Sequence, residues 1–221
     1  MPDQGGRSSV LFADRVDAGA RLAARLSGLS WTDPVVLGLA RGGVPIAAIV
    51  AARLGAELDV AVVRKIAAPG RPEFGVGAVT ADGPPRYDER TLDRLGLTPD
   101  DLRRDCERER REVLRRLRRY RGDRAPPRLT GRDVILVDDG LATGVTARAA
   151  LGELRRSGPR RLVYAAPVCA RDSAVALRAD GDADEVICLA APRAFGDVSR
   201  WYRRFEQLTD DEVLAALGSM S

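Results

Sequence analysis

The stretch VILVDDGLATGVT, residues 134–146, decides the fold. Its four leading apolar residues, Val134 to Val137, are typical of a parallel strand that is buried on both faces. Two aspartates follow, then small and hydroxyl-bearing residues, and then the apolar spacing of a helix from Val145 to about Ser157. The stretch therefore predicts a strand, a tight loop and a helix, in that order.

The same alternation continues on both sides of this stretch. Further strands are predicted at 35–39, 58–63, 76–79, 162–168 and 185–189, and further helices at about 12–26, 45–54, 98–120, 172–179 and from Thr209 onward. Repeated strand–helix order is typical of α/β proteins, whose crossover connections are right-handed. We therefore predict an α/β fold with a doubly wound, mostly parallel sheet.

Breaks in composition divide the chain into three parts. Residues 81–86 are rich in Gly and Pro, and Pro126-Pro127 marks a second break. We predict a core at 10–82 and 128–190, an Arg-rich helical insertion at 83–127 and a small C-terminal hood or cap at 191–221. Within the core, residues 65–71 predict a loop because they contain Pro69 and Gly70.

The bulk composition is that of a soluble globular protein, with 45% hydrophobic and 31% charged residues. Met1 to Ser9 is polar, and no run approaches the roughly 20 apolar residues of a membrane span. We therefore expect a cytoplasmic protein without a membrane partner. Lys65 is the only lysine among 36 basic residues. Such a bias toward arginine usually reflects nucleotide composition, so the net charge of +4 is weak evidence for nucleic-acid binding.

The absence of histidine restricts the possible chemistry. Without His or a Cys-x-x-Cys pair, the three scattered cysteines, Cys106, Cys169 and Cys188, make a zinc site or a Cys/His nucleophile improbable. Any general base must then be a carboxylate, a bound phosphate or water.

The polar half of the stretch predicts a site for a sugar phosphate. A buried strand delivers Asp138 and Asp139 to the sheet edge where open α/β folds bind ligands. Adjacent carboxylates repel each other unless a diol or a cation shares them. Gly140 and Gly144 allow close backbone approach, and the N–H groups that begin the next helix attract an anion. Ribose 5-phosphate offers both a diol and a phosphate.

Other readings of these residues fit less well. No Gly-Lys-Ser/Thr ends the loop, so it is not a Walker A loop, and it is not a Gly-x-Gly-x-x-Gly dinucleotide loop. An ordinary strand–turn–helix remains open, because Asp, Gly and Thr are common in turns.

The stretch resembles the 5-phosphoribosyl-1-pyrophosphate (PRPP) signature of the type I phosphoribosyltransferases. That signature joins four hydrophobic residues, two acidic residues and a Thr-Gly-x-Thr loop, which match at 134–139 and 143–146. The resemblance extends over roughly Phe12 to Leu189, where the strand order and two further loops also fit. The chain looks most like stand-alone bacterial members whose acceptor is generally unassigned.

The resemblance implies an Mg²⁺-dependent enzyme that transfers the 5-phosphoribosyl group from PRPP to a nitrogenous acceptor such as a nucleobase and releases pyrophosphate. Asp138 and Asp139 would bind the ribose hydroxyls and would meet the metal indirectly, through those hydroxyls or water. The residues implied to wrap the 5-phosphate are Gly140, Leu141, Ala142, Thr143, Gly144, Val145 and Thr146.

The resemblance also implies a pyrophosphate loop at Ala40-Arg41-Gly42-Gly43, which in the family often contains a non-proline cis peptide. Arg64 and Lys65 fall where the family's flexible catalytic loop begins, and they would neutralise the departing pyrophosphate. An ordinary helix-entry turn at 40–43 and plain surface charge at Arg64 and Lys65 remain alternatives.

The chain departs from some members in ways that bear on the acceptor. Relatives that use 6-oxopurines place an acidic general base where this chain has Ala142, and Leu141 to Gly144 instead looks like the adenine- and uracil-using enzymes. Glu73 is a weak substitute base. Phe195, Trp201 and Tyr202 follow the last core strand and are candidates to stack an acceptor, although ordinary packing of the cap explains them equally well.

The sequence is also compatible with two other classes of function. A PRPP- or nucleotide-sensing regulator would bind RNA or DNA through the basic residues 115–121 of the insertion, although a solvated, salt-bridged helix is the simpler interpretation. A phosphosugar hydrolase lacks a recognisable nucleophile. The expected partners are PRPP and the acceptor, and a homodimer is compatible with the sequence.

Overall fold

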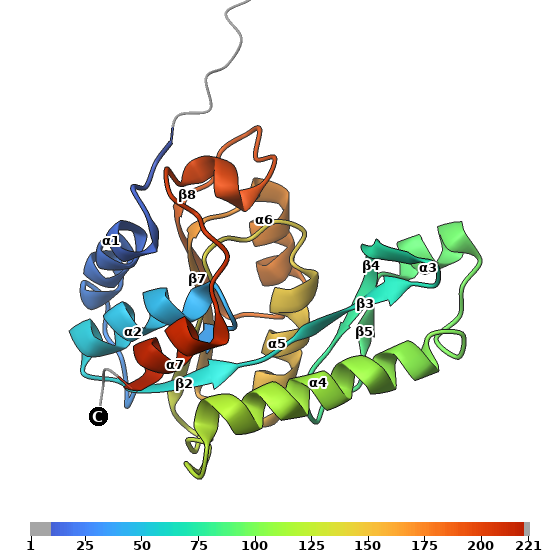
Figure 1. Ribbon diagram of the computed structural model, residues 1–221. Coiled ribbons are helices and arrows are strands. Elements are labelled where there is room, and N and C mark those ends of the chain that lie inside the picture. Colours follow the sequence, from blue (N-terminus) through green and yellow to red (C-terminus); the bar gives the residue numbers. More distant parts are fainter. Residues whose placement is uncertain (1–9, 219–221) are drawn as a thin grey trace, which may run out of the picture.

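A five-stranded parallel sheet forms the centre of the protein. The structure is a computed structural model that describes residues 10–218, except for the side chains of Pro72 and Glu73. The strand order is β2-β1-β6-β7-β8 (Figure 1). The strands are β1 (Val35–Leu39), β2 (Glu57–Ala61), β6 (Asp133–Val137), β7 (Arg161–Val168) and β8 (Glu185–Ala190). The predicted doubly wound sheet is confirmed, and its order reverses between β1 and β6.

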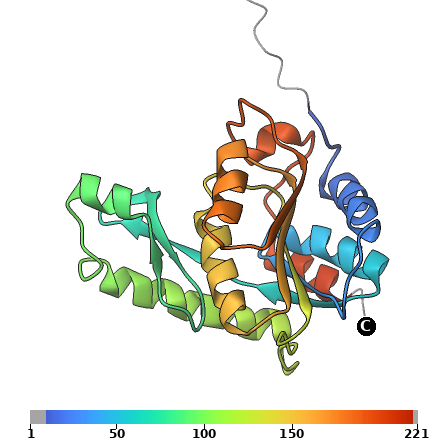
Figure 2. The ribbon, with the colours of Figure 1, turned by 180° about the vertical axis from the view of Figure 1, so that it is seen from behind.

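Helices cover both faces of this sheet (Figures 1 and 2). One hydrophobic cluster joins the sheet to α1 (Arg15–Ser27), α2 (Gly43–Leu54) and α7 (Asp210–Gly218). A second cluster joins the opposite face to α5 (Val145–Arg156) and α6 (Arg171–Ala179). All five residues of β1 and of β6 are buried, as their unbroken apolar sequences predict.

The first helix is shorter than its sequence pattern predicts. Asp14 caps α1 by accepting hydrogen bonds from the backbone N–H groups of Val16 and Asp17, both at 3.0 Å. Phe12 therefore lies before the helix, where it pairs with Tyr202, and Val16 is exposed.

The predicted loop at 65–71 is wrong. Residues 64–79 form an antiparallel hairpin of β3 (Arg64–Ala68) and β4 (Arg71–Val79), to which β5 (Arg86–Tyr87) adds a third strand. Pro69 and Gly70 make the connecting turn, with Gly70 in the left-handed region at φ 72°. The Pro-Gly pair thus reverses the direction of the chain between β3 and β4. Hydrogen bonds between these two strands stabilise the extended conformation, which the local sequence alone does not indicate.

Two helices occupy the predicted insertion, where the sequence pattern indicates one. Asp88 caps α3 (Glu89–Leu95), which was not predicted, by accepting from the N–H of Thr91 at 3.2 Å. The long helix α4 (Arg103–Arg121) begins later than predicted, because the Asp101 carboxylate accepts from the N–H of Thr98 at 2.8 Å and closes a separate turn.

The insertion shares a hydrophobic cluster with the preceding hairpin. Ile66 and Val76 of the hairpin pack with Leu92 of α3 and with Leu102 and Cys106. The predicted boundary between residues 82 and 83 therefore does not coincide with a gap in packing.

Both ends of the described chain build the cap. The N–H groups of Leu11 and Phe12 donate to the carbonyl of Trp201, each at 3.0 Å, beside the 3₁₀ helix η1 (Val198–Trp201). Glu212 accepts from the N–H of Thr209 at 2.7 Å, as the predicted capping box requires. Met1 to Ser9 and the last three residues of the predicted cap lie outside the described residues. Among residues 10–218, no helix is both long and apolar enough to cross a bilayer.

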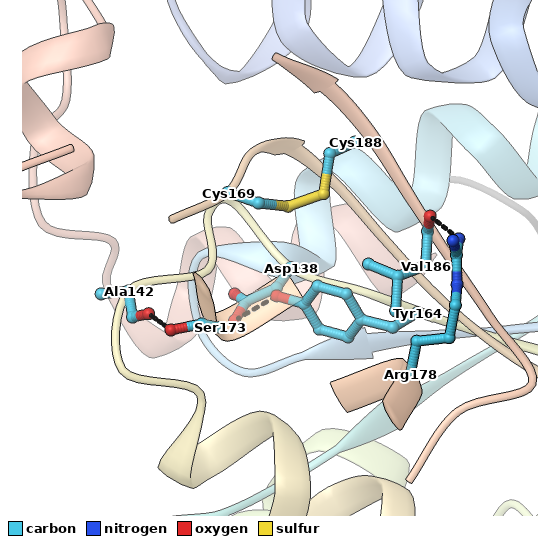
Figure 3. Close-up of a disulfide and its surroundings, with 8 residues drawn as sticks. All are labelled: Asp138, Ala142, Tyr164, Cys169, Ser173, Arg178, Val186 and Cys188. Atoms are coloured by element: carbon cyan, nitrogen blue, oxygen red, sulfur yellow. Dashed lines mark hydrogen bonds between the residues drawn. A yellow bond between two sulfur atoms is a disulfide. The ribbon is translucent and has the colours of Figure 1, made fainter. Parts of the chain in front are cut away.

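A disulfide links the residue that follows β7 to the interior of β8. Cys169 and Cys188 form it across a sequence separation of 19 residues, and Cys106 is buried and unpaired. The disulfide lies near Tyr164 and Asp138 (Figure 3).

Reduction of this disulfide should destabilise the protein by about 3 kcal/mol, since a cross-link closing a loop of this size restricts the unfolded chain. Urea unfolding with and without dithiothreitol measures the change. The Cys188→Ser variant should match the reduced protein and should not respond to dithiothreitol. A response as large as that of the native protein would contradict the prediction.

Candidate functional site

The loops after β1 and β6 meet at one edge of the sheet. The two strands pair in parallel, with Gly38 opposite Val137, so their carboxyl ends lie side by side. A Cβ atom on Gly42 would lie 1.8 Å from Oδ2 of Asp139, and one on Gly43 would lie 2.3 Å from the carbonyl oxygen of Val137. The structure thus brings the predicted pyrophosphate loop into contact with the predicted diol site.

The Ala40–Arg41 peptide bond is cis, as the family resemblance leads one to expect. The Arg41 side chain points toward α7, with Nη1 3.9 Å from Oδ1 of Asp210. The same carboxylate oxygen accepts a 2.6 Å hydrogen bond from the hydroxyl of Tyr120 on α4. Burial and this bond raise the pKa of Tyr120 to about 12. The turn is therefore connected to both α7 and α4.

Arg15 neutralises the second carboxylate of the acidic pair. Its Nε and Nη2 both donate to Oδ2 of Asp139, at 3.0 and 2.9 Å. Behind Asp139, the hydroxyl of Tyr202 donates to the backbone carbonyl at 2.6 Å. Burial raises the pKa of Asp139, while the charge of Arg15 opposes that rise.

Asp138 has weaker partners. Its Oδ1 accepts from the N–H of Asp139 at 2.8 Å, and the hydroxyl of the fully buried Tyr164 lies 3.5 Å from its Oδ2. Burial raises the pKa of Asp138 well above the usual range, and the charge of Asp139 raises it further. Burial and mutual repulsion therefore disfavour ionisation of both carboxylates at once.

The loop from Gly140 to Thr146 ends in a helix that has no side-chain cap. Gly144 precedes α5 in the left-handed region, at φ 81°, and no side chain there accepts from the first turn of the helix. Free N–H groups at a helix N-terminus, together with the helix dipole, attract an anion. The first turn of α5 thus has no side-chain cap at the place where the sequence predicts a phosphate.

Neighbouring elements hold this loop in position. The N–H of Leu141 donates to the carbonyl of Val168 at 2.9 Å, and its carbonyl accepts from Ala170 at 2.7 Å. Ser173 donates a hydrogen bond to the carbonyl of Ala142 (Figure 3). A Cβ on Gly140 would lie 2.5 Å from Val198, so the cap packs directly against the loop.

The two predicted cations of β3 point in different directions. Nε of Arg64 donates to Oε2 of Glu109 on α4 at 2.9 Å, so Arg64 is engaged away from the acidic pair. Lys65 is exposed. The pKa of Asp197 in the cap is lowered mainly by hydrogen bonds from Ser199, and also by the charges of Arg200 and Lys65. The Lys65 stem lies beside Gly75 of β4, with its Cδ 3.6 Å from the position of a Cβ on that glycine.

The aromatic candidates of the cap differ in exposure. Trp201 is 6% exposed, and its Nε1 donates to the carbonyl of Phe195 at 3.0 Å, so it serves as cap core. Tyr202 is also buried, beneath Asp139. Phe195 is half-buried, with its ring 6.3 Å from that of Trp201. Only Phe195 of these three retains appreciable exposure.

Sequence reasoning did not find Arg15 or Tyr164. Arg15 is one of many arginines, and its pairing with Asp139 spans 124 positions. Tyr164 lies inside an apolar strand, where an aromatic residue indicates core. Neither residue had a local signal that could separate it from its neighbours.

Substitution of Gly42 by Ala should disrupt the site, because the added methyl group would overlap the Asp139 carboxylate. We expect a loss of about 1–3 kcal/mol in the free energy of unfolding, as in other overpacked sites. Chemical denaturation measures it. Gly28→Ala is the matched control, because its Cβ would meet only the Arg25 carbonyl at 3.6 Å. Equal stabilities for the two variants would contradict the described contact.

Comparison with known proteins agrees with this geometry. The family model described as phosphoribosyl transferase domain matches residues 11–198. Two Mycobacterium tuberculosis strains contain a protein, provisionally named a phosphoribosyl transferase, that is 44% identical over 94% of this chain. The match covers 46% of that protein, so the chain spans about half the length of these relatives.

A solved structure extends the comparison to three dimensions. The crystal structure of TT1426 from Thermus thermophilus is 44% identical to this chain and superimposes with a TM-score of 0.77. The match covers 94% of this chain and 97% of that one. The chain therefore belongs to the phosphoribosyl transferase domain family.

Proposed function

We propose that this protein transfers the 5-phosphoribosyl group from PRPP to a nitrogenous acceptor and releases pyrophosphate. The observation that supports this most is the convergence of three features at one sheet edge. An acidic pair follows β6, a close-packed glycine turn follows β1, and an uncapped helix N-terminus follows within the same loop. A ligand with a diol between two phosphate groups matches that arrangement.

Each part of the donor has a proposed partner. Asp138 and Asp139 accept hydrogen bonds from the ribose hydroxyls, and the 5-phosphate binds the N–H groups that begin α5. The pyrophosphate lies along the turn at Arg41, Gly42 and Gly43. Breaking the bond from C1 to the pyrophosphate leaves an oxocarbenium-like centre, which the acceptor nitrogen attacks.

Mg²⁺ is proposed to arrive with the donor. In the part of the chain that the structure describes, no group of three or more acidic or cysteine side chains could hold a metal alone. One oxygen of Asp139 is already engaged by Arg15. These residues fit a metal that is held mainly by the donor's oxygens and met by the carboxylates only indirectly. When bound, such a metal neutralises the charge of the leaving pyrophosphate.

The acceptor is proposed to be a base that needs little deprotonation. Ala142 stands where a carboxylate base would be needed for 6-oxopurines, and the side chain of Glu73, the substitute base, lies outside the described residues. Phe195 is the cap aromatic with enough exposure to contact an acceptor.

We also propose that the protein is located in the cytoplasm and that it assembles as a homodimer.

Ion pairs along α4 weigh against the nucleic-acid alternative. Of the basic residues at 115–121, Arg115 and Arg116 pair with Glu112, Arg119 pairs with Asp210 and Asp211, and Arg121 pairs with Asp59. Hydrogen bonds from Arg115 and Arg116 hold the pKa of Glu112 down at about 2. The face is therefore a largely neutralised salt-bridged helix.

Replacing both carboxylates, as Asp138→Asn with Asp139→Asn, should abolish PRPP binding while the protein stays folded. Two neutral amides lose the charged acceptors of the diol but keep the shape of the site. Calorimetric titration with PRPP and Mg²⁺ measures binding, and circular dichroism checks the fold. Undiminished affinity would refute the assignment of the donor site.

Lys65→Met should lower kcat by about 10²–10³, the range found when a group that stabilises transition-state charge is removed. Arg64→Met is the matched control, because Arg64 is bound to Glu109, and it should have a much smaller effect. Pyrophosphate release across a panel of purines, pyrimidines and small amines supplies the assay. A larger effect from Arg64 would reverse the roles. No release with any acceptor would count against the proposed function itself.

A further inference from the structure

The Arg15–Asp139 pair lies inside the candidate site. Arg15 belongs to the first turn of α1, and Asp139 is the second residue of the acidic pair. Both guanidinium donors, Nε and Nη2, reach the same oxygen, Oδ2. The two side chains are only 12% and 15% exposed, so the pair is screened little by solvent.

The cap fixes the guanidinium from the other side. Nη1 of Arg15 donates to the carbonyl of Glu206 at 2.9 Å, and its Cζ lies 3.9 Å above the centre of the Phe205 ring. A cation over an aromatic face is electrostatically stabilised. Arg15 is therefore held in place by groups that do not belong to the acidic pair.

These contacts occupy Oδ2 of Asp139 and disfavour a metal ion there. The oxygen accepts two N–H groups and lies against the backbone of Gly42. Mg²⁺ requires an oxygen lone pair at about 2.0–2.1 Å, and here it would also approach the positive charge of Arg15. Oδ1 of Asp138 is likewise engaged, by the N–H of Asp139.

The opposite charges of Arg15 and Asp139 bear on how the acidic pair could bind an anionic ligand. An ionised carboxylate would repel a ligand that carries several phosphate groups, and the fixed guanidinium of Arg15 offsets the charge of Asp139. We propose that Arg15 is a built-in counter-ion that takes the place of a divalent cation at Asp139, so that the acidic pair receives a polyanionic sugar phosphate without a metal of its own. The sugar-phosphate part rests on the proposed function, whereas the exclusion of the metal does not.

Metal binding to the free protein tests the exclusion directly. Native protein titrated with Mn²⁺ alone should show no binding that depends on Asp139. Arg15→Met should gain Mn²⁺ affinity of about tenfold or more, because a nearby repelling charge is removed. Adding Asp139→Asn to Arg15→Met should remove the gain. Equal Mn²⁺ binding by native protein and Arg15→Met would overturn the proposal.

Matched variants distinguish the loss of the Arg15 charge from a merely structural effect of the substitution. Arg21→Met breaks an exposed ion pair with Asp17 on the same helix and should leave Mn²⁺ binding unchanged. Arg15→Lys keeps the charge and should not gain affinity. Arg15→Gln removes the charge but keeps a hydrogen-bond donor, and it should behave as Arg15→Met does even if the latter folds poorly. A gain in Arg15→Lys equal to that in Arg15→Gln would also overturn the proposal.

Donor binding supplies the second readout. Arg15→Met should weaken PRPP binding about tenfold, and this effect should disappear in the Asp139→Asn background, because Arg15 acts through Asp139. An undiminished effect in that background would contradict a role through Asp139. If native protein does not bind PRPP at all, the proposed function fails, while the Mn²⁺ titration still decides whether Arg15 excludes the metal.

Discussion

The parallel pairing of β1 with β6 is the constraint on which the site depends. Both strands are completely buried, so their register is held by packing on both faces as well as by hydrogen bonds. Their carboxyl ends deliver two loops to one place, with so little space between them that Gly42 and Gly43 cannot carry a side chain without displacing their neighbours. At the point where the strand order reverses, an open α/β sheet has its natural ligand crevice.

The cap contacts this edge of the sheet through hydrogen bonds, a cation–π contact and apolar packing. Tyr202 holds the backbone of Asp139, Phe205 and Glu206 hold Arg15, and Val198 packs on Gly140. Both ends of the described chain therefore contact a loop that comes from its middle. This explains why Arg15, far away in sequence, can neutralise a carboxylate that follows the central strand.

The sequence predicted the parallel core well because its strands are short apolar runs bounded by turns, a pattern that few other elements share. It failed at 65–71, where the hairpin is defined by cross-strand pairing and Pro69-Gly70 resembles a loop. The acidic pair and the loop before α5 could be singled out in the sequence because they are contiguous. Arg15 was not, because its partner lies across the fold. The directions of Arg64 and Lys65 depend on strand register, which no local pattern specifies.

A crystal structure of this chain with PRPP and Mg²⁺ would test the central claim most directly. We expect the ribose hydroxyls within hydrogen-bond distance of Asp138 and Asp139, the 5-phosphate at the N-terminus of α5, and the pyrophosphate along Gly42 and Gly43. We also expect that Arg15 still contacts Asp139 and that the metal is coordinated chiefly by the donor. A donor bound away from the acidic pair, or a metal ligated directly by Oδ2 of Asp139, would contradict it.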